Sequence, residues 1–284
     1  MKPAPFRYHT PQSVDEAVAL LAKVAPNDGR VLAGGQSLVP MMALRLARPE
    51  DLVDINAIPA LGQCVSDGEY LSIGACVRHA AFHGSVVENS LGALLGEVAN
   101  HIAHYPIRTR GTFCGSLAHA DPSSEWCLVA AALGAEIRAQ SMRGTRIIGV
   151  EDFFHGAMAT ALDPDELLTE IRLPLLGVDS VFGFYEFSRR AGDYALSAAL
   201  ALYRLKDGVI AEPRLALAGA ENNPRRIVEA EAVLNGARPS GEVFRAAAHA
   251  ASEAIEPLTY AQVSADFRRK LVRTVAERAL ARTV

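Results

Sequence analysis

The amino-acid sequence predicts an α+β protein in which a larger N-terminal part precedes a separate C-terminal α+β domain. Half of the 284 residues are apolar, which is enough for a packed core. In the N-terminal part, strand-like and helical segments alternate. Beyond Pro174–Gly177, strand-like segments come first and alanine-rich helices follow, an order that is typical of an independent α+β unit.

The chain begins with a helix and a strand–loop–helix–strand unit. Ser13 can cap the first helix, at 13–22, and Glu16 stands where it can close a capping box. Pro49 stops the second helix. The strand, helix and strand of the unit are expected at 30–33, 38–46 and 51–55. Its loop lies at the carboxyl end of a strand, where α/β proteins commonly bind ligands.

Periodic segments continue through the rest of the chain. Leu91, Leu94, Leu95 and Val98 recur at helical spacing. Helices are expected at 77–82, 91–101 and 126–133, and strands at 70–73, 136–139, 145–148 and 167–173. For the C-terminal domain, the expected strands are 182–189, 198–205 and 214–218, and the expected helices are 227–234, 243–254 and 260–281.

Two glycine-rich segments are the most informative motifs. The first is Ala33-Gly34-Gly35-Gln36-Ser37-Leu38, and the second runs from Thr109 to Pro122. Neither is a P-loop or a Rossmann fingerprint. A plain strand-to-helix turn would explain the first segment alone. Because glycine lets backbone N–H groups approach an anion, both segments together predict a phosphate-bearing ligand such as a dinucleotide, with Ser37 and Ser116 hydroxyls as further donors.

Other site chemistries have weaker support. Ser116, His119 and Asp121 have the residue types of a nucleophilic triad, but they are close neighbours in sequence and lack a G-x-S-x-G elbow. His101 and His104 have no nearby Cys or acidic partner for a metal. The four cysteines form no C-x-x-C pair, so buried or free thiols are expected.

Charge and hydropathy argue against several classes of partner. The formal net charge of −4 offers no basic surface for nucleic acid. No apolar run reaches the roughly 18 residues of a membrane-spanning helix. Residues 1–8 lack the apolar core of a signal peptide. We therefore expect a cytoplasmic protein with no membrane span and no nucleic-acid partner.

Taken together, the motifs resemble the FAD-binding medium subunit of molybdenum hydroxylases, the carbon monoxide dehydrogenase and xanthine dehydrogenase family. The resemblance rests on Ala33–Leu38, Arg45–Pro49, Leu52–Asn56, Ile107–Thr112, Gly115–Pro122, Asp165–Leu168 and Gly192–Ala195. It implies an FAD-binding fold of the vanillyl-alcohol-oxidase (PCMH) type with lobes at 1–57 and 58–176. A C-terminal α+β domain at 177–284, an antiparallel sheet with helices, would complete the chain.

The resemblance also implies which residues bind FAD. The pyrophosphate would lie against Ala33, Gly34, Gly35, Gln36, Ser37, Thr112, Gly115 and Ser116. The further cofactor-binding positions are Leu38, Ile102, Ala103, His119, Asp121, Glu125, Leu168 and Tyr194. Leu168 would lie near the adenine. From local sequence, Tyr194 is either an aromatic residue packed between domains or a ring stacked on a planar cofactor, and the resemblance places it over one face of the isoalloxazine. No residue is nominated as a catalytic acid, base or nucleophile, or as a metal ligand.

Cys114 departs from the family pattern, which has Gly-Gly where this chain has Cys114-Gly115. A cysteine adds a Cβ and a thiol, so this position is expected to tolerate a side chain or to be slightly shifted.

The family's mechanism implies partner chains. A large molybdopterin subunit would hydroxylate the substrate, and a small subunit with [2Fe–2S] clusters would pass electrons to FAD on this chain and on to an external acceptor. A dimer of heterotrimers is expected. N-heterocycles, aldehydes and carbon monoxide are all compatible substrates, because the substrate binds to another chain. The alternatives are a flavin-free scaffold subunit and a stand-alone flavin oxidase, which needs a base over the flavin.

Overall fold

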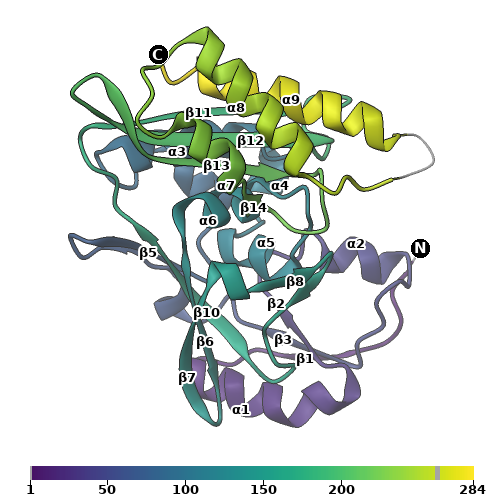
Figure 1. Ribbon diagram of the computed structural model, residues 1–284. Coiled ribbons are helices and arrows are strands. Elements are labelled where there is room, and N and C mark those ends of the chain that lie inside the picture. Colours follow the sequence, from purple (N-terminus) through teal and green to yellow (C-terminus); the bar gives the residue numbers. More distant parts are fainter. Residues whose placement is uncertain (1, 260–262) are drawn as a thin grey trace.

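A computed structural model describes residues 2–259 and 263–284. These residues form a mixed helix and sheet structure with a three-stranded, a five-stranded, a four-stranded and a two-stranded sheet. In Figure 1, the C-terminal elements form the upper end of the molecule, and the first strands and the first helix form the lower end together with the strands at 136–141, 144–149 and 167–174 from the middle of the chain. The predicted α+β class is confirmed.

The first sheet is parallel, with strand order β1-β3-β2. Its strands are β1 (Arg7–His9), β2 (Arg30–Leu32) and β3 (Asp51–Asp54), and its helices are α1 (Val14–Val24) and α2 (Leu38–Ala43). Ser13 caps α1 as predicted, but the Glu16 carboxylate accepts from the Gln12 N–H in place of that of Ser13. The second helix ends earlier than expected, since Arg45 has a φ of 59°.

The second sheet is antiparallel, with strand order β4-β5-β10-β6-β7. Its strands are β4 (Cys64–Ser66), β5 (Tyr70–Gly74), β6 (Glu136–Ser141), β7 (Gly144–Gly149) and β10 (Leu167–Pro174). A small hairpin pairs β8 (Phe154–Gly156) with β9 (Ala159–Thr160). The helices here are α3 (Ser90–His101), α4 (Tyr105–Arg108), α5 (Phe113–His119) and α6 (Glu125–Leu133).

The helix expected at 77–82 is present as a short 3₁₀ helix, η3 (His79–His83). Further 3₁₀ turns are η1 (Ala25–Asn27), η2 (Pro59–Gly62) and η4 (Val150–Asp152). Within the second glycine-rich segment, Thr112 caps the short helix α5, which was not among the expected helices.

The C-terminal sheet has the order β11-β12-β13-β14 and is antiparallel. Its strands are β11 (Ser180–Phe187), β12 (Ser197–Lys206), β13 (Val209–Ala218) and β14 (Arg225–Arg226). The helices α7 (Val228–Leu234), α8 (Gly241–Ala254) and α9 (Ala265–Ala281) follow. Of the helix expected at 260–281, residues 260–262 lie outside the described part of the chain.

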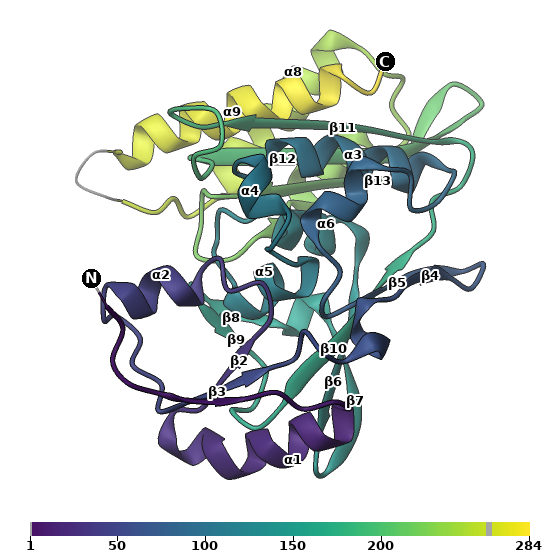
Figure 2. The same cartoon turned by 180° about the vertical axis from the view of Figure 1, so that it is seen from behind.

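Helices cover both faces of this C-terminal sheet (Figures 1 and 2). The helices α7 and α9 contact the strands on one side, where α8 packs against both helices, and α3 and α6 from the preceding part pack against the other face. Phe184 and Leu200 from the sheet therefore belong to the same buried cluster as Trp126 and Leu128 from α6. One continuous hydrophobic core crosses the boundary expected at residue 177.

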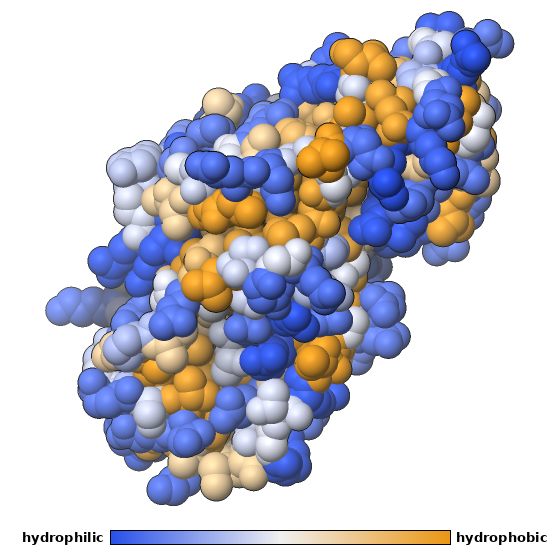
Figure 3. All heavy atoms as spheres, turned by 90° about the vertical axis from the view of Figure 1, so that its left-hand side faces the viewer, coloured by the Kyte–Doolittle hydropathy of each residue, from blue (hydrophilic) through white to orange (hydrophobic). Residues whose placement is uncertain are grey.

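Apolar residues gather in small patches between broad polar areas on the face in Figure 3. Within residues 2–259 and 263–284, no helix combines the length and apolar character needed to cross a membrane.

Candidate cofactor site

The two glycine-rich segments meet in space. A Cβ on Gly34 would lie 2.3 Å from the Arg110 carbonyl oxygen and 2.7 Å from the Gly111 Cα. Gly35 has a φ of 71°, a conformation that side chains with a Cβ rarely adopt. The close approach of the segments thus depends on glycine at position 34, and the turn depends on glycine at position 35.

The first segment presents unpaired backbone donors. Among the described residues, no acceptor reaches the N–H groups of residues 34–37. The Gln36 side chain donates to the Gly34 carbonyl at 3.1 Å and so leaves these N–H groups free. A row of unpaired N–H groups is suited to a phosphate, because a phosphate offers several acceptor oxygens and a negative charge.

Gly115 has a different local role from the one that its motif indicates. The Thr112 hydroxyl accepts a hydrogen bond from the Gly115 N–H at 3.0 Å and caps α5. A Cβ on Gly115 would lie 2.7 Å from that hydroxyl oxygen. This N–H is therefore already paired, and the glycine allows the cap to form.

Three of the residues predicted to bind the cofactor line the same small cleft. Ala33, Gly115 and Leu168 all line a largely apolar space of about 80 Å³. Ala33 follows β2, Gly115 lies in α5 and Leu168 lies in β10. Residues from both expected lobes therefore face the same space.

Tyr194 brings the C-terminal domain to the same site. It follows β11, is 63% exposed, and lies close to the Ser37 side chain. Partial burial and the neighbouring carboxylates of Asp121 and Glu125 raise the pKa of Tyr194. This single side chain therefore connects the first glycine-rich segment with the loop before α6.

The turn after α3 lies against the Tyr194 loop. Ala103 has a φ of 44°, and the Arg108 guanidinium donates to the Ile102 and Ala103 carbonyls at 2.8 and 3.1 Å. A Cβ on Gly192 would lie 3.1 Å from the Ala103 carbonyl oxygen. Arg108 thus stabilises a left-handed turn that the Tyr194 loop contacts.

Glu125 is a buried acid at the start of α6. Burial, the Glu186 carboxylate and Asp121 raise its pKa to about 8, although a hydrogen bond with its own backbone opposes the shift. The Glu186 side chain is 6% exposed, and its Oε1 lies 3.3 Å from His101 Nδ1. At neutral pH, Glu125 is therefore mostly protonated.

The pKa of His119, another predicted cofactor-binding residue, is also shifted. Burial lowers this pKa, and the nearby Asp121 opposes the shift.

Comparison with known proteins agrees with this geometry. Residues 4–176 match the family model described as the FAD binding domain in molybdopterin dehydrogenase. Residues 182–283 match the CO dehydrogenase flavoprotein C-terminal domain. The chain is an FAD-binding medium subunit of the molybdenum hydroxylase family. It is thus a subunit of an oxidoreductase complex.

Relatives of this medium subunit match along nearly its whole length. The nicotine 6-hydroxylase medium subunit of Paenarthrobacter nicotinovorans is 36% identical, over 99% of this chain and 98% of that one. From the same organism, the 6-hydroxypseudooxynicotine dehydrogenase complex subunit alpha is 39% identical, over 100% and 96%. A solved carbon monoxide dehydrogenase structure from Hydrogenophaga pseudoflava superposes with a TM-score of 0.95 at 35% identity, covering 100% of this chain and 98% of that one.

An aromatic cluster supports the second segment of the medium subunit. Trp126 donates to His79 Nδ1 at 2.8 Å, and its ring stacks on Phe113 with centroids 4.5 Å apart. Burial first, and then the nearby Arg108 and Arg78, lower the pKa of His79 to about 4, so its ring is neutral and able to accept this bond. The same ring lies against Gly111, where a Cβ would lie 2.4 Å from Nε2.

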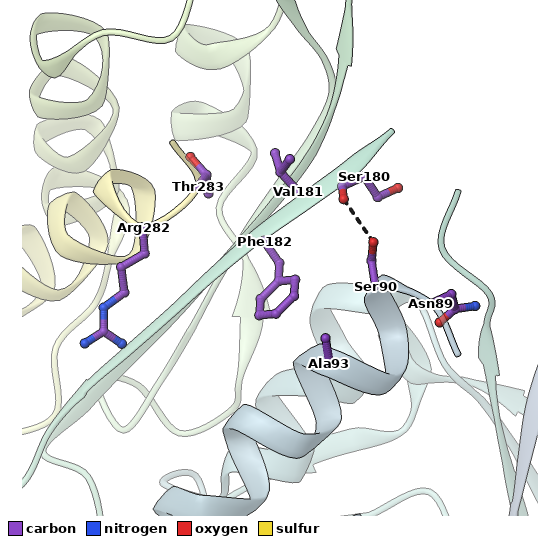
Figure 4. Close-up of a pocket in the computed structure, with 8 residues that line it drawn as sticks. All are labelled: Asn89, Ser90, Ala93, Ser180, Val181, Phe182, Arg282 and Thr283. Atoms are coloured by element: carbon purple, nitrogen blue, oxygen red, sulfur yellow. Dashed lines mark hydrogen bonds between the residues drawn. The ribbon is translucent and has the colours of Figure 1, made fainter. Parts of the chain in front are cut away.

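A second hollow, wider than the cleft at Leu168, lies elsewhere on the medium subunit. It has a volume of about 440 Å³ and lies between α3, β11 and the end of the chain (Figure 4). Ser90 donates to the Ser180 carbonyl at its edge, at 3.1 Å. None of the residues predicted to bind the cofactor lines it.

Sequence reasoning missed several polar residues around the site. Asn56 and Arg78 contact the two glycine-rich segments, and Glu186 faces Glu125. Asn56 belongs to a motif that carries the family resemblance, but the motif alone assigns it no partner. The contacts of Arg78 and Glu186 join elements that are distant in the sequence.

Cys114 is accommodated without positive φ. It lies in α5, is buried, and its Sγ is 3.4 Å from the Ile73 carbonyl oxygen. Burial holds the pKa of this thiol well above its usual range. The position therefore tolerates a side chain, which is one of the two outcomes expected from the sequence.

Restoring the family glycine at this position is expected to lower stability without improving the site. Cys114→Gly removes a buried side chain and adds backbone freedom to α5, so the free energy of unfolding should fall by about 1–2 kcal/mol. Urea unfolding measures the loss, and Cys114→Ala, which keeps a Cβ, is the matched control. Tighter FAD binding by Cys114→Gly would contradict this interpretation.

Proposed function

We propose that this medium subunit receives electrons from a small [2Fe–2S] subunit and delivers them to an external acceptor. FAD, when bound, supplies the redox chemistry, because it can exchange electrons singly or in pairs. A large molybdopterin subunit would carry out the hydroxylation, and the complex would be a cytoplasmic dimer of heterotrimers. The contribution of this chain is then to bind and orient the cofactor.

The meeting of the two glycine-rich segments is the observation that carries this proposal. Gly34 touches the Arg110–Gly111 backbone, and the N–H groups of residues 34–37 stay unpaired among the described residues. Such a site fits the diphosphate of FAD. We accordingly propose lobes at 1–57 and 58–176 around the cofactor, with the domain at 177–284 closing the site through Tyr194.

The other predicted residues support the same placement. The apolar cleft at Leu168 would take the adenine ring, and the Tyr194 ring, near Ser37, would cover one face of the isoalloxazine. Ile102 and Ala103 offer backbone groups beside the Tyr194 loop, and Asp121 offers a carboxylate. The remaining proposed cofactor-binding positions are Ala33, Gln36, Ser37, Leu38, Thr112, Gly115, Ser116, His119 and Glu125.

Flavin content tests the proposal. The purified chain is expected to be yellow and to release FAD on denaturation. Gly35→Trp should abolish FAD binding while assembly with the partner subunits persists, because position 35 requires a φ of 71° and a Cβ there would lie 3.1 Å from the Leu32 and Val39 side chains.

Two results would contradict the proposed function. A colourless chain that cannot be reconstituted with FAD would indicate the flavin-free scaffold. Rapid bleaching of the isolated yellow chain by a small substrate, without partner subunits, would indicate a stand-alone oxidase.

A further inference from the structure

Two polar side chains stand between the glycine-rich segments and have no part in the function described so far. Asn56 follows β3, and its amide nitrogen donates to the Ala33 carbonyl at 2.8 Å and to Asp54 Oδ1 at 2.5 Å. The Asn56 backbone N–H also donates to Asp54 Oδ1, at 2.9 Å. Asp54 therefore holds Asn56 in place beside the first segment.

Arg78 continues this connection to the second segment. Its Nη2 donates to Asn56 Oδ1 at 2.6 Å, and its Nη1 donates to the Arg110 carbonyl. The backbone near Arg78 also contacts the second segment through a bridge to Thr112. A series of hydrogen bonds thus runs from the Ala33 carbonyl through both side chains to the Arg110 carbonyl.

The chemistry of each link fixes its direction. A carbonyl can only accept, so the Asn56 nitrogen must face Ala33. A guanidinium can only donate, so the Asn56 oxygen must face Arg78. Arg78 uses two nitrogens of its planar fork for two partners, a geometry that a lysine ammonium does not reproduce.

We propose that Asn56 and Arg78 form a clamp that sets the distance between the two glycine-rich segments before the cofactor binds. They are positioning residues. One end of the clamp is the Ala33 carbonyl, next to Gly34, and the other end is the Arg110 carbonyl that Gly34 approaches. Fixing the site in advance lowers the ordering cost of binding. The clamp rests on the proposed assignment of the diphosphate to these segments.

FAD affinity of two single variants and the double variant tests the clamp. Arg78→Lys keeps the charge and loses the fork, and Asn56→Asp keeps the acceptor for Arg78 and loses the donor to Ala33. Each should weaken FAD binding at least about tenfold, the change expected on losing a hydrogen bond to a charged group or leaving an acceptor unpaired. Because the links act in series, the double variant should bind about as weakly as the weaker single variant.

A matched control separates the clamp from general stability. Arg172→Lys also breaks a two-partner fork, from Arg172 to Glu136 and Asp67, that involves neither glycine-rich segment. This control should bind FAD like the parent chain. In the cofactor-free chain, the N–H groups of Arg110 and Gly111 donate to the Ile107 carbonyl, and their amide hydrogen exchange should be faster in the clamp variants than in the control.

The outcomes distinguish the clamp from the proposed function. Unchanged FAD affinity in Arg78→Lys would show that charge alone matters and would overturn the clamp. Additive losses in the double variant, or unchanged exchange at Arg110 and Gly111, would also overturn it. A parent chain that does not bind FAD would contradict the cofactor assignment itself, and the clamp with it.

Discussion

Gly34→Ala is expected to weaken FAD binding strongly. The new Cβ would lie 2.3 Å from the Arg110 carbonyl oxygen, and the obstructing atoms are backbone, so the two glycine-rich segments must move apart. Overpacking of this kind costs about 1–3 kcal/mol, which corresponds to a roughly five- to 150-fold rise in Kd. Titration of the cofactor-free chain with FAD, followed by flavin fluorescence, measures the change.

Gly62→Ala is the matched control for this prediction. Gly62 ends η2, and a Cβ there would meet nothing within 4 Å. Its FAD affinity should equal that of the parent. Equal affinity of the Gly34→Ala and Gly62→Ala variants would show that the close approach of the segments has no part in binding.

Glu125→Gln is expected to stabilise the chain in alkaline solution. The folded chain holds a proton on Glu125 up to a pKa of about 8, whereas the unfolded chain loses it near the ordinary glutamate pKa of 4.5. Between these values the folded state binds more protons, so its stability falls as pH rises, by roughly 1.4 kcal/mol for each pH unit of a full one-proton difference. Glutamine has no proton to lose and removes this dependence.

Urea unfolding at pH 5 and at pH 8.5 tests the second prediction. The variant and parent should be similar at pH 5, and the variant should be more stable by several kcal/mol at pH 8.5, the upper limit being the full pKa difference. Glu229→Gln, in the first turn of α7 and exposed, is the control for charge at a helix start. An equal pH response in both variants would show that Glu125 is ionised in the folded chain.

Much of the fold could be predicted because its segments have clear hydrophobic periods. The buried helix α6 and the strands β12 and β13 lie close to their predicted positions. The three-residue strand β1 was missed because its side chains are mostly exposed and only the pairing with β3 defines it. Helix α5 was read as loop because its glycines outweigh the Thr112 cap in a local reading.

The site was predictable only as far as it is encoded in contiguous motifs. The glycine-rich segments could be predicted as a binding site from their glycines, which lack a Cβ, and from their resemblance to the family motifs. The bonds of Arg78 to Asn56 and Arg110 span 22 and 32 residues of sequence, so no local pattern contains them. The protonation of Glu125 likewise depends on Glu186, which arrives from β11 in the C-terminal sheet.

The hydrophobic core that crosses residue 177 makes the FAD-binding domain and the C-terminal domain depend on each other for folding. Every residue of α6 is buried, and β11 to β13 supply part of its cover. A gene split at that boundary would yield an N-terminal fragment with a bare apolar helix, prone to self-association. Its partner fragment would carry Tyr194 away from Ser37. A hybrid of two relatives joined at this point must therefore keep matching side chains in the shared core as well as an intact reading frame.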